Sequence, residues 1–355
     1  MAKFVPHNYQ QYAIDFLLKH EQAGLFLDMG LGKTVITLTA LDILKKRGEI
    51  NKVLIVAPKL VAENVWHQEP QKWDHLQDLT FSYILGTPRK REKALKAQAD
   101  IYVITRDNVA WLVDYLKNTW FFDTLVLDEL SSFKNHQSKR FKKLRKIRPY
   151  VKRVIGLTGT PIPNGYMDLW AEMYLLDMGK RLGKYITEYR RNYFYELNRW
   201  SFIEYKLIPG ADKIIDQKIS DICLSMKAKD YLNLKEPQVI DIKVELSSKE
   251  MKAYKEMEKE AVLAIDEEVI TATSAGIVVN KLLQLANGAI YTQEQRDSKI
   301  IHNRKLEALE ELVEQAAGEN VIVYYTYQHD KERILQKFPE ARLLKTEKDV
   351  EDWNA

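Results

Sequence analysis

The residues best suited to chemistry lie at positions 25–34, where the apolar run Leu25-Phe26-Leu27 leads into Asp28-Met29-Gly30-Leu31-Gly32-Lys33-Thr34. A strand that turns sharply into a helix can direct several backbone N–H groups at one point, where the helix dipole also favours negative charge. A lysine there adds a positive charge for the outer phosphates, and a threonine hydroxyl can bind Mg²⁺. We therefore predict a triphosphate site at Met29, Gly30, Leu31, Gly32, Lys33 and Thr34, with Thr34 on the metal.

The glycine spacing of this segment leaves a second interpretation open. The general phosphate-loop pattern has glycine six residues before the lysine, whereas this chain has Leu27 there and its additional glycine at Gly30. A simple strand-to-helix turn with an exposed lysine would use the same residues. The local sequence favours the phosphate site without excluding the turn.

A pair of acids, Asp128-Glu129, directly follows the apolar run Leu125-Val126-Leu127. A nucleotide site needs one carboxylate for Mg²⁺ and a second acceptor to orient the attacking water. We assign Asp128 to the metal and Glu129 to the water. An isolated acidic pair could equally end a strand in solvent, but its place after a phosphate loop favours catalysis by Lys33, Asp128 and Glu129.

Gln10 precedes a helix predicted over residues 12–18. A glutamine amide both donates and accepts hydrogen bonds, so it suits the edge of adenine. Its alternative role is that of an ordinary polar residue at a helix start. With the phosphate loop next in the chain, we predict that Gln10 selects adenine and that the cofactors are ATP and Mg²⁺.

These residues require a parallel sheet to bring them together. Apolar runs predict strands at residues 25–27, 52–57, 101–104, 125–127 and 154–157, with a helix over 35–46. In such sheets ligands bind at the carboxyl ends of the strands. That edge would carry Pro58, Lys59, Thr105, Arg106, Asp128, Glu129, Thr158, Gly159 and Thr160.

Composition limits the class of protein. The chain has 355 residues, which suggests about two domains at one per ~150 residues. A net charge of +4 permits nucleic acid as a partner without requiring it. No apolar run approaches the ~20 residues of a membrane span, so we expect no membrane partner. The single cysteine, Cys223, excludes an internal disulfide, and no histidine spacing indicates zinc.

Two basic segments each have two interpretations. In residues 138–153, Phe141, Leu144 and Ile147 recur at three-residue steps among many lysines and arginines, which favours a solvated helix over a DNA-binding patch. In residues 184–194, basic and aromatic residues alternate. That segment fits a DNA contact and an apolar helix face equally well.

Taken together, the motifs resemble those of superfamily-two helicase-type ATPases, and among them the Swi/Snf-type double-stranded DNA translocases. The resemblance is carried by residues 28–34, by Asp128-Glu129 with Lys134-Asn135, and by Leu157-Thr158-Gly159-Thr160-Pro161-Ile162-Pro163-Asn164. Supporting residues are Tyr9-Gln10, Ala57-Pro58, Trp66, Glu69, Trp73, and residues 306–309 and 321–325. This family's phosphate loop has no glycine at the position of Leu27.

The resemblance implies an α/β fold of two RecA-like lobes with parallel sheets flanked by helices, the second lobe incomplete. We expect the first lobe at residues 1–164, its helical extension at 165–237 and the beginning of lobe two at 238–355. ATP would bind between the lobes and double-stranded DNA across them. Pro58, Lys59, Thr105 and Arg106 would contact the DNA backbone, and Thr158, Gly159 and Thr160 would couple hydrolysis to DNA. Ser131 replaces the histidine common in the acidic motif.

For lobe two we predict a strand over residues 239–246, a charged helix from Ser247 or Ser248 with Glu250 in a capping box, and a buried helix around residues 282–290 that ends in the glycine turn. Leu306, Leu309, Val313 and Ala316 predict a further core-facing helix. The family's ATP-contacting arginine is expected beyond Ala355. It would come from the remaining part of lobe two or from another protein, so hydrolysis by this chain alone is expected to be weak.

These features favour an ATP-dependent double-stranded DNA translocase. Two alternatives remain: a helicase that separates DNA or RNA strands, and a nucleotide-gated DNA-binding module without turnover. We expect a monomer, located in the cytoplasm of a bacterial or virus-infected cell, or in the nucleus of a eukaryote.

Overall fold

The computed structural model describes residues 2–159, 165–199, 202–231, 240–260, 262–265, 268–271, 275–292, 297–316 and 320–354. Two compact units divide the chain, at residues 1–236 and 237–355. The predicted coupling residue Thr160, and residues 161–164 of the same motif, lie outside the described residues. None of the described helices is long and apolar enough to cross a membrane.

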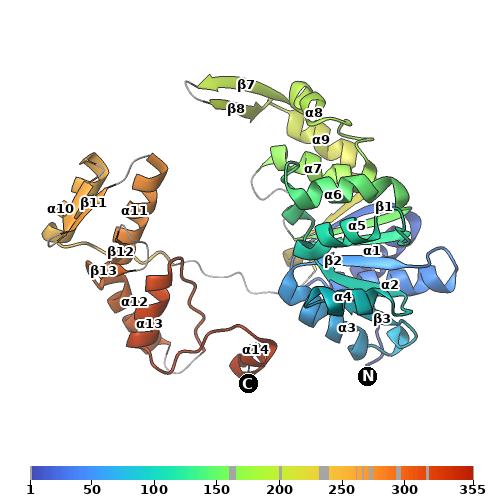
Figure 1. The fold of residues 1–355 in the computed structure, drawn as a ribbon, viewed down its shortest axis with the longest axis horizontal. Helices are drawn as coiled ribbons and strands as arrows, with labels where there is room; N and C mark the ends of the chain where they lie inside the picture. Colours follow the sequence, from blue (N-terminus) through green and yellow to red (C-terminus); the bar gives the residue numbers. More distant parts are fainter. Residues whose placement is uncertain are drawn as a thin grey trace. The chain divides into compact units, whose positions relative to one another are not determined.

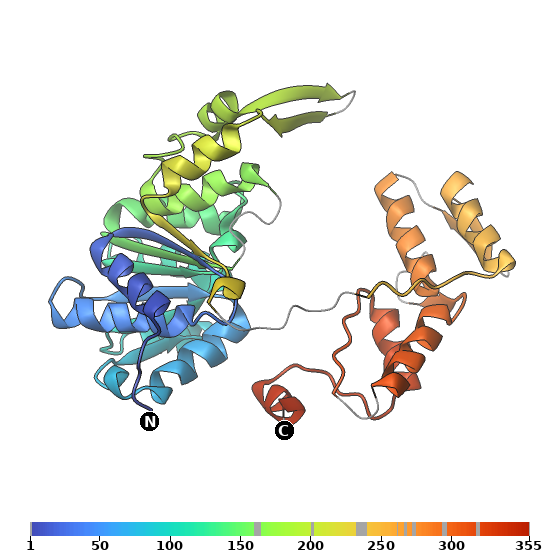
Figure 2. The ribbon, with the colours of Figure 1, turned by 180° about the vertical axis from the view of Figure 1, so that it is seen from behind.

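The first unit is built on a seven-stranded parallel sheet, shown in Figures 1 and 2. Its strands are β1 (Gln22–Leu27), β2 (Val53–Ala57), β3 (Phe81–Ile84), β4 (Ile101–Thr105), β5 (Thr124–Asp128), β6 (Arg153–Thr158) and β9 (Cys223–Met226). They are arranged in the order β3-β4-β2-β5-β6-β1-β9, and every neighbouring pair is parallel. The predicted α/β architecture is therefore confirmed.

Helices cover both faces of this sheet, which explains why its inner strands are mostly apolar runs rather than alternating ones. In β2, Leu54 and Val56 enter one core, and Val53, Ile55 and Ala57 enter the other. The helices of one face are α1 (Asn8–Lys19), α2 (Lys33–Lys46) and α3 (Trp66–Lys72), and those of the other are α4 (Pro88–Leu95), α5 (Val109–Leu116), α6 (Lys139–Ile147), α7 (Tyr166–Asp177), α8 (Ile186–Tyr193) and α9 (Ala211–Ile219).

The predicted helical extension contains more than helices. Besides α7, α8 and α9 it holds an antiparallel hairpin, β7 (Phe194–Arg199) and β8 (Phe202–Leu207), which extends beyond α8 and α9 in Figure 1. It also supplies β9, the seventh strand of the main sheet, beside β1. The sequence of β9, Cys-Leu-Ser-Met, has no β-branched residue, so it carries no strand signal.

The basic helix α6 follows its predicted pattern. Phe141, Leu144 and Ile147 are buried, and the Ser138 hydroxyl caps the helix by accepting a hydrogen bond from the Phe141 N–H at 3.3 Å. Arg148, just beyond the helix, is an exception among the basic residues. It is buried and donates to the carbonyls of Leu175 and Leu176 at the end of α7.

Helix α8, in the second basic segment, uses its aromatic residues for packing. Tyr189 is fully buried, Tyr193 nearly so, and the Arg190 guanidinium lies 4.6 Å from the ring centre of Tyr205 on β8. These contacts favour the apolar-face interpretation. Lys184 and Arg191 are exposed.

The second unit contains helices and short antiparallel strand pairs. Its helices are α10 (Ser248–Glu260), α11 (Ala275–Asn287), α12 (Arg304–Gln315), α13 (Gln328–Lys337) and α14 (Glu347–Asn354), and its strands are β10 (Val262–Ile265) with β11 (Glu268–Thr271) and β12 (Ala289–Tyr291) with β13 (Ser298–Ile300). The predicted capping box of α10 is confirmed. The Ser247 N–H donates to Glu250 Oε2 at 2.6 Å, and the Glu250 N–H donates to Ser247 Oγ at 3.4 Å.

One prediction for this unit was wrong. Residues 240–246 form no strand, and Ile240 is 75% exposed, because an alternating segment becomes a strand only when another strand pairs with it. The predicted helix around 282–290 belongs to α11, which ends at Asn287, and Gly288, with φ +100°, makes the predicted glycine turn into β12. The helix predicted from Leu306, Leu309, Val313 and Ala316 is α12, and these four residues are half-buried.

Candidate nucleotide site

The phosphate loop, residues 28–32, connects the end of β1 to Lys33, the first residue of α2. Gly30 and Gly32 have left-handed backbone, with φ 86° and 78°, which glycine adopts without steric cost. A Cβ on Gly32 would also lie 2.7 Å from Nε2 of Gln10. Gly32 is therefore needed both for the turn and for the approach of Gln10.

Gln10 is buried against this loop at the start of α1. Its Oε1 accepts a hydrogen bond from the His7 backbone N–H at 2.9 Å, and its amide nitrogen faces Gly32. Gln10 thus connects the beginning of α1 to the phosphate loop. This bond uses one lone pair of Oε1 and leaves the other. The contact of Gln10 with adenine stays a prediction.

Lys33 reaches back over the loop. Its ammonium donates to the carbonyls of Leu27 at 2.6 Å and of Asp28 at 3.2 Å. Burial lowers the pKa of Lys33, while the carboxylates of Asp128, Glu129 and Asp28 oppose that shift. The loop lysine and the predicted acidic pair therefore belong to one electrostatic cluster. Thr34, beside it in the first turn of α2, is half-buried, and Met29 is 86% exposed.

Asp128 ends β5 and is held by two donors. The indole Nε1–H of Trp66 donates to Oδ2 at 2.8 Å, and the Glu129 N–H donates to Oδ1 at 3.0 Å. Burial raises the pKa of Asp128, and the two hydrogen bonds oppose that rise. The carboxylate is therefore fixed in orientation, and each oxygen keeps a lone pair for a further contact.

Glu129 has a left-handed backbone, with φ 56° and ψ 62°. This conformation is uncommon for a residue other than glycine and occurs often at functional sites. The Ser131 hydroxyl donates to its Oε1 at 2.6 Å. Ser131, which occupies the position of the family's histidine, thus orients the predicted water-binding carboxylate.

Strand β6 places Thr158 and Gly159 between the loop and the acids. Thr158 is opposite Phe26 of β1, and Leu157 is opposite Asp128 of β5. A Cβ on Gly159 would lie 3.6 Å from the Leu27 carbonyl and 3.9 Å from the Lys33 ammonium. The three motifs therefore meet at one edge of the sheet, as its parallel topology predicts.

The sequence was compared with known protein families. The sequence profile of the SNF2-related domain matches residues 9–289, more than half of the chain. The chain belongs to the SNF2-related family. Its Lys33, Asp128 and Gly159 motifs all lie within the matched range.

Relatives of this SNF2-related chain include a phage protein and a eukaryotic helicase. Protein p41 of Acyrthosiphon pisum secondary endosymbiont phage 1 is 37% identical over 366 residues, covering 100% of this chain and 79% of p41. The ATP-dependent helicase FUN30 of Saccharomyces cerevisiae is 35% identical over 175 residues, which cover 46% of this chain but only 15% of FUN30. The chain thus resembles a small part of the eukaryotic protein.

A solved structure shares the fold. The SWI2/SNF2 ATPase core of Sulfolobus solfataricus in complex with double-stranded DNA has a TM-score of 0.54 at 20% identity, covering 99% of this chain and 75% of that one. The ATPase core domain on its own gives a TM-score of 0.51 at 22% identity, covering 97% and 71%. This chain therefore shares the fold of the SWI2/SNF2 ATPase core.

The residues predicted to contact DNA lie at the same sheet edge, on neighbouring strands. Ala57 of β2 pairs with Thr105 of β4, so Lys59 and Arg106 follow adjacent strand ends. Lys59 is exposed, and Pro58 and Arg106 are half-buried. Thr105 is only 5% exposed, and its hydroxyl accepts a hydrogen bond from the Asn108 amide at 2.8 Å. Lys59 and Arg106 are thus the better placed of the four.

Trp66 has a role at the site that its motif alone did not predict. The π-helical turn Val61–Val65 leads directly into Trp66, whose side chain is fully buried. Its contact with Asp128 spans 62 positions in the chain. No local pattern encodes such a pairing.

Glu172, on α7, was also not predicted. It is fully buried, and both carboxyl oxygens lack a hydrogen-bond partner among the described residues. Helix α7 packs on the short turn Leu130–Phe133 that follows Glu129. Burial, with help from Asp168 and Glu129, raises the pKa of Glu172 to about 9 against the opposing charge of Lys134. Glu172 is therefore a neutral carboxylic acid at neutral pH.

Glu172→Gln should stabilise the protein, and more so as pH rises. The folded state keeps a proton up to about pH 9 that the unfolded chain releases near pH 4.5, so wild-type stability falls between these values. Urea unfolding should show the gain from Glu172→Gln growing by about 1.4 kcal/mol per pH unit across this window. The exposed residue Glu63 provides the control Glu63→Gln, with no such trend. A gain independent of pH would contradict a protonated Glu172.

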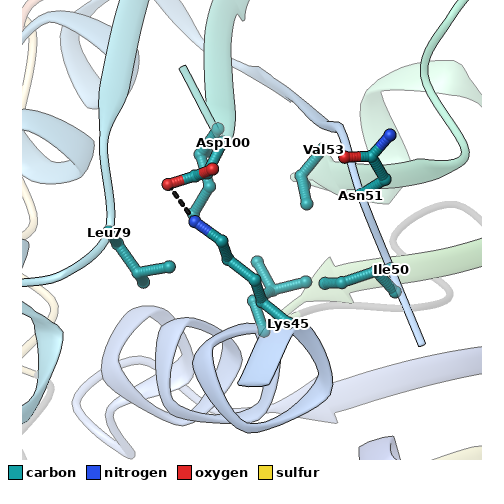
Figure 3. A pocket seen from close by; sticks show the side chains of 8 residues that line it. Lys45, Ile50, Asn51, Val53, Leu79 and Asp100 are labelled. Atoms are coloured by element: carbon teal, nitrogen blue, oxygen red, sulfur yellow. Dashed lines mark ion pairs between the residues drawn. The ribbon is translucent and has the colours of Figure 1, made fainter. Parts of the chain in front are cut away.

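A hollow elsewhere on this unit is unsuited to ligands (Figure 3). It lies at the amino ends of β2 and β4, beside Val53 and Ile101, and its lining includes an ion pair between Lys45 and Asp100. It has no space for a water-sized sphere. The phosphate loop, at the carboxyl ends of the strands, is the better candidate.

Proposed function

We propose that this SNF2-family chain binds Mg-ATP at residues 29–34 and uses its hydrolysis to move along double-stranded DNA. The observation that carries the proposal is the position of Lys33. Its ammonium lies on a glycine turn, in the field of Asp28, Asp128 and Glu129, and within 3.9 Å of where a side chain on Gly159 would be. The phosphate loop, the acidic pair and Gly159 therefore all lie around the Lys33 ammonium.

The residues fit a bound Mg²⁺. This ion favours oxygen ligands, and proteins usually supply one or two carboxylates while phosphates and water supply the rest. Asp128 offers an oriented carboxylate with a lone pair remaining on each oxygen, and Thr34 offers a hydroxyl at the helix start. When bound, the ion would neutralise phosphate charge.

The chain's own residues would then divide the work of hydrolysis. Lys33 would exchange its bonds to the loop carbonyls for bonds to phosphate oxygens, and the N–H groups of the loop would bind the same phosphates. Glu129, oriented by Ser131, would accept a hydrogen bond from the attacking water and position it in line. Thr158 and Gly159, beside the loop, would transmit the change in phosphate state.

Double-stranded DNA as the partner is supported by the structural relative from Sulfolobus solfataricus, whose SWI2/SNF2 ATPase core was solved in complex with dsDNA. In this chain, Lys59 and Arg106 would bind backbone phosphates from neighbouring strand ends. The domain limits 1–164, 165–237 and 238–355 remain our proposal for how the motor is divided.

The test compares ATP hydrolysis with and without duplex DNA, followed by displacement of a third strand from a triplex. We expect duplex DNA to stimulate turnover from the low rate predicted for residues 1–355 alone, and ATP to drive slow triplex displacement without separation of the duplex strands. Duplex unwinding would favour the helicase alternative instead. DNA binding that responds to nucleotide without any turnover would favour the gated-module alternative.

The need for an arginine from outside residues 1–355 stays a prediction. A supplied arginine is worth roughly 10³ to 10⁵ in turnover in related phosphoryl-transfer enzymes. Rapid, DNA-stimulated hydrolysis by residues 1–355 alone would contradict it.

A further inference from the structure

Three aromatic rings lie together at the start of α1, beside Gln10. The rings of His7 and Tyr9 stack with centroids 5.6 Å apart, and the ring of Tyr231 lies 4.9 Å from that of Tyr9. Tyr9 is 8% exposed, whereas Tyr231 is 47% exposed and His7 is also exposed. Tyr231 thus covers Tyr9 and presents its own ring surface to solvent, next to the residue that packs on the phosphate loop.

Tyr231 belongs to a segment that is attached to the phosphate loop itself. After β9, the Ala228 N–H donates to Asp28 Oδ2 at 2.8 Å, and the Asp28 N–H donates to the Met226 carbonyl at 3.1 Å. The Tyr231 N–H in turn donates to the Ala228 carbonyl at 3.1 Å. Two hydrogen bonds to Asp28 and one within the turn therefore hold the backbone of this segment beside the phosphate loop.

We propose that Tyr231 stacks on the base of the nucleotide whose phosphates bind at residues 29–34. This inference rests on the proposed function, because it requires a nucleotide at the loop. An aromatic ring can stack on any base, so stacking supplies affinity without selecting the base by hydrogen bonds.

Gln10 and Tyr231 would contact different parts of the base. The Oε1 of Gln10 already accepts the His7 N–H, and its amide nitrogen faces Gly32. One lone pair of Oε1 and the amide N–H groups remain for the edge of a base, whereas a stacked ring would contact the face of the same base. Tyr231 offers an exposed ring whose segment is fixed to the loop by hydrogen bonds.

The experiment measures two affinities of the full chain by calorimetry, one for Mg-ATP and one for Mg-tripolyphosphate, which has no base. Tyr231→Ala should weaken ATP binding roughly tenfold, the scale of one base on one ring, and leave tripolyphosphate binding unchanged. Tyr231→Trp should retain ATP affinity. Tyr150→Ala removes a ring that is 72% exposed elsewhere on the unit and serves as the matched control.

Each outcome has one meaning. Wild-type affinity for ATP in Tyr231→Ala would overturn the stacking role while leaving the phosphate site intact. Equal losses of ATP and tripolyphosphate would also overturn it, because the substitution would then act through the loop. A wild-type chain that binds neither ligand would instead refute the proposed function on which the inference rests.

Discussion

A Lys33→Ala variant is expected to remain folded and to lose ATP binding, with an affinity at least about 100-fold weaker than wild type. That loss corresponds to ~3 kcal/mol, the upper range for a hydrogen bond to a charged group. Lys33 is the one loop side chain with a positive charge, and no other group in residues 28–34 can replace it. Calorimetric titration with Mg-ATP measures the effect.

The matched control lies on the same helix. Lys46, at the far end of α2, pairs with Asp42 at 2.8 Å, and its side chain is 54% exposed. Lys46→Ala removes the same charge and the same side chain, and should leave ATP affinity unchanged. If Lys33→Ala bound Mg-ATP as tightly as this control, residues 28–34 would be a simple turn rather than a phosphate site.

The second large effect is expected from Glu129→Gln, which should keep ATP affinity and lose roughly 10² to 10⁴ in turnover, the range for removal of a positioned general base. The amide has almost the same shape as the carboxylate, and its oxygen can still accept the hydrogen bond from Ser131. It carries no negative charge with which to accept a proton from the attacking water.

Two measurements separate this result from a structural defect. Calorimetry should give the same ATP affinity for Glu129→Gln and wild type, and Glu63→Gln, at an exposed site, should hydrolyse ATP normally. Persistent hydrolysis by Glu129→Gln would show that the water is oriented by another group. Loss of both binding and turnover would point to the left-handed backbone at Glu129 as the sensitive feature.

The parts of the fold that the sequence predicted well are those with a local signal. An apolar run buried on both faces identified β1, β2, β4, β5 and β6, and the polar residues after each run were correctly expected at one sheet edge. The helix α6 and the capping box of α10 were also predicted, because their patterns repeat within a few residues. Residues 240–246 show the limit of local patterns, since alternation does not guarantee a partner strand.

The sequence by itself therefore determined the parallel sheet and the residues at its edge that we predict to form the phosphate loop and the acidic pair. Only the tertiary structure decided which residues hold the side chains of Asp28 and Asp128 in position. Trp66 orients Asp128 across 62 positions, and Ala228 holds Asp28 across 200. It also placed β9 beside β1 and buried Glu172 with no hydrogen-bond partner in the described part of the chain. Such contacts depend on which distant segments pack together, and no short pattern of residues records that choice.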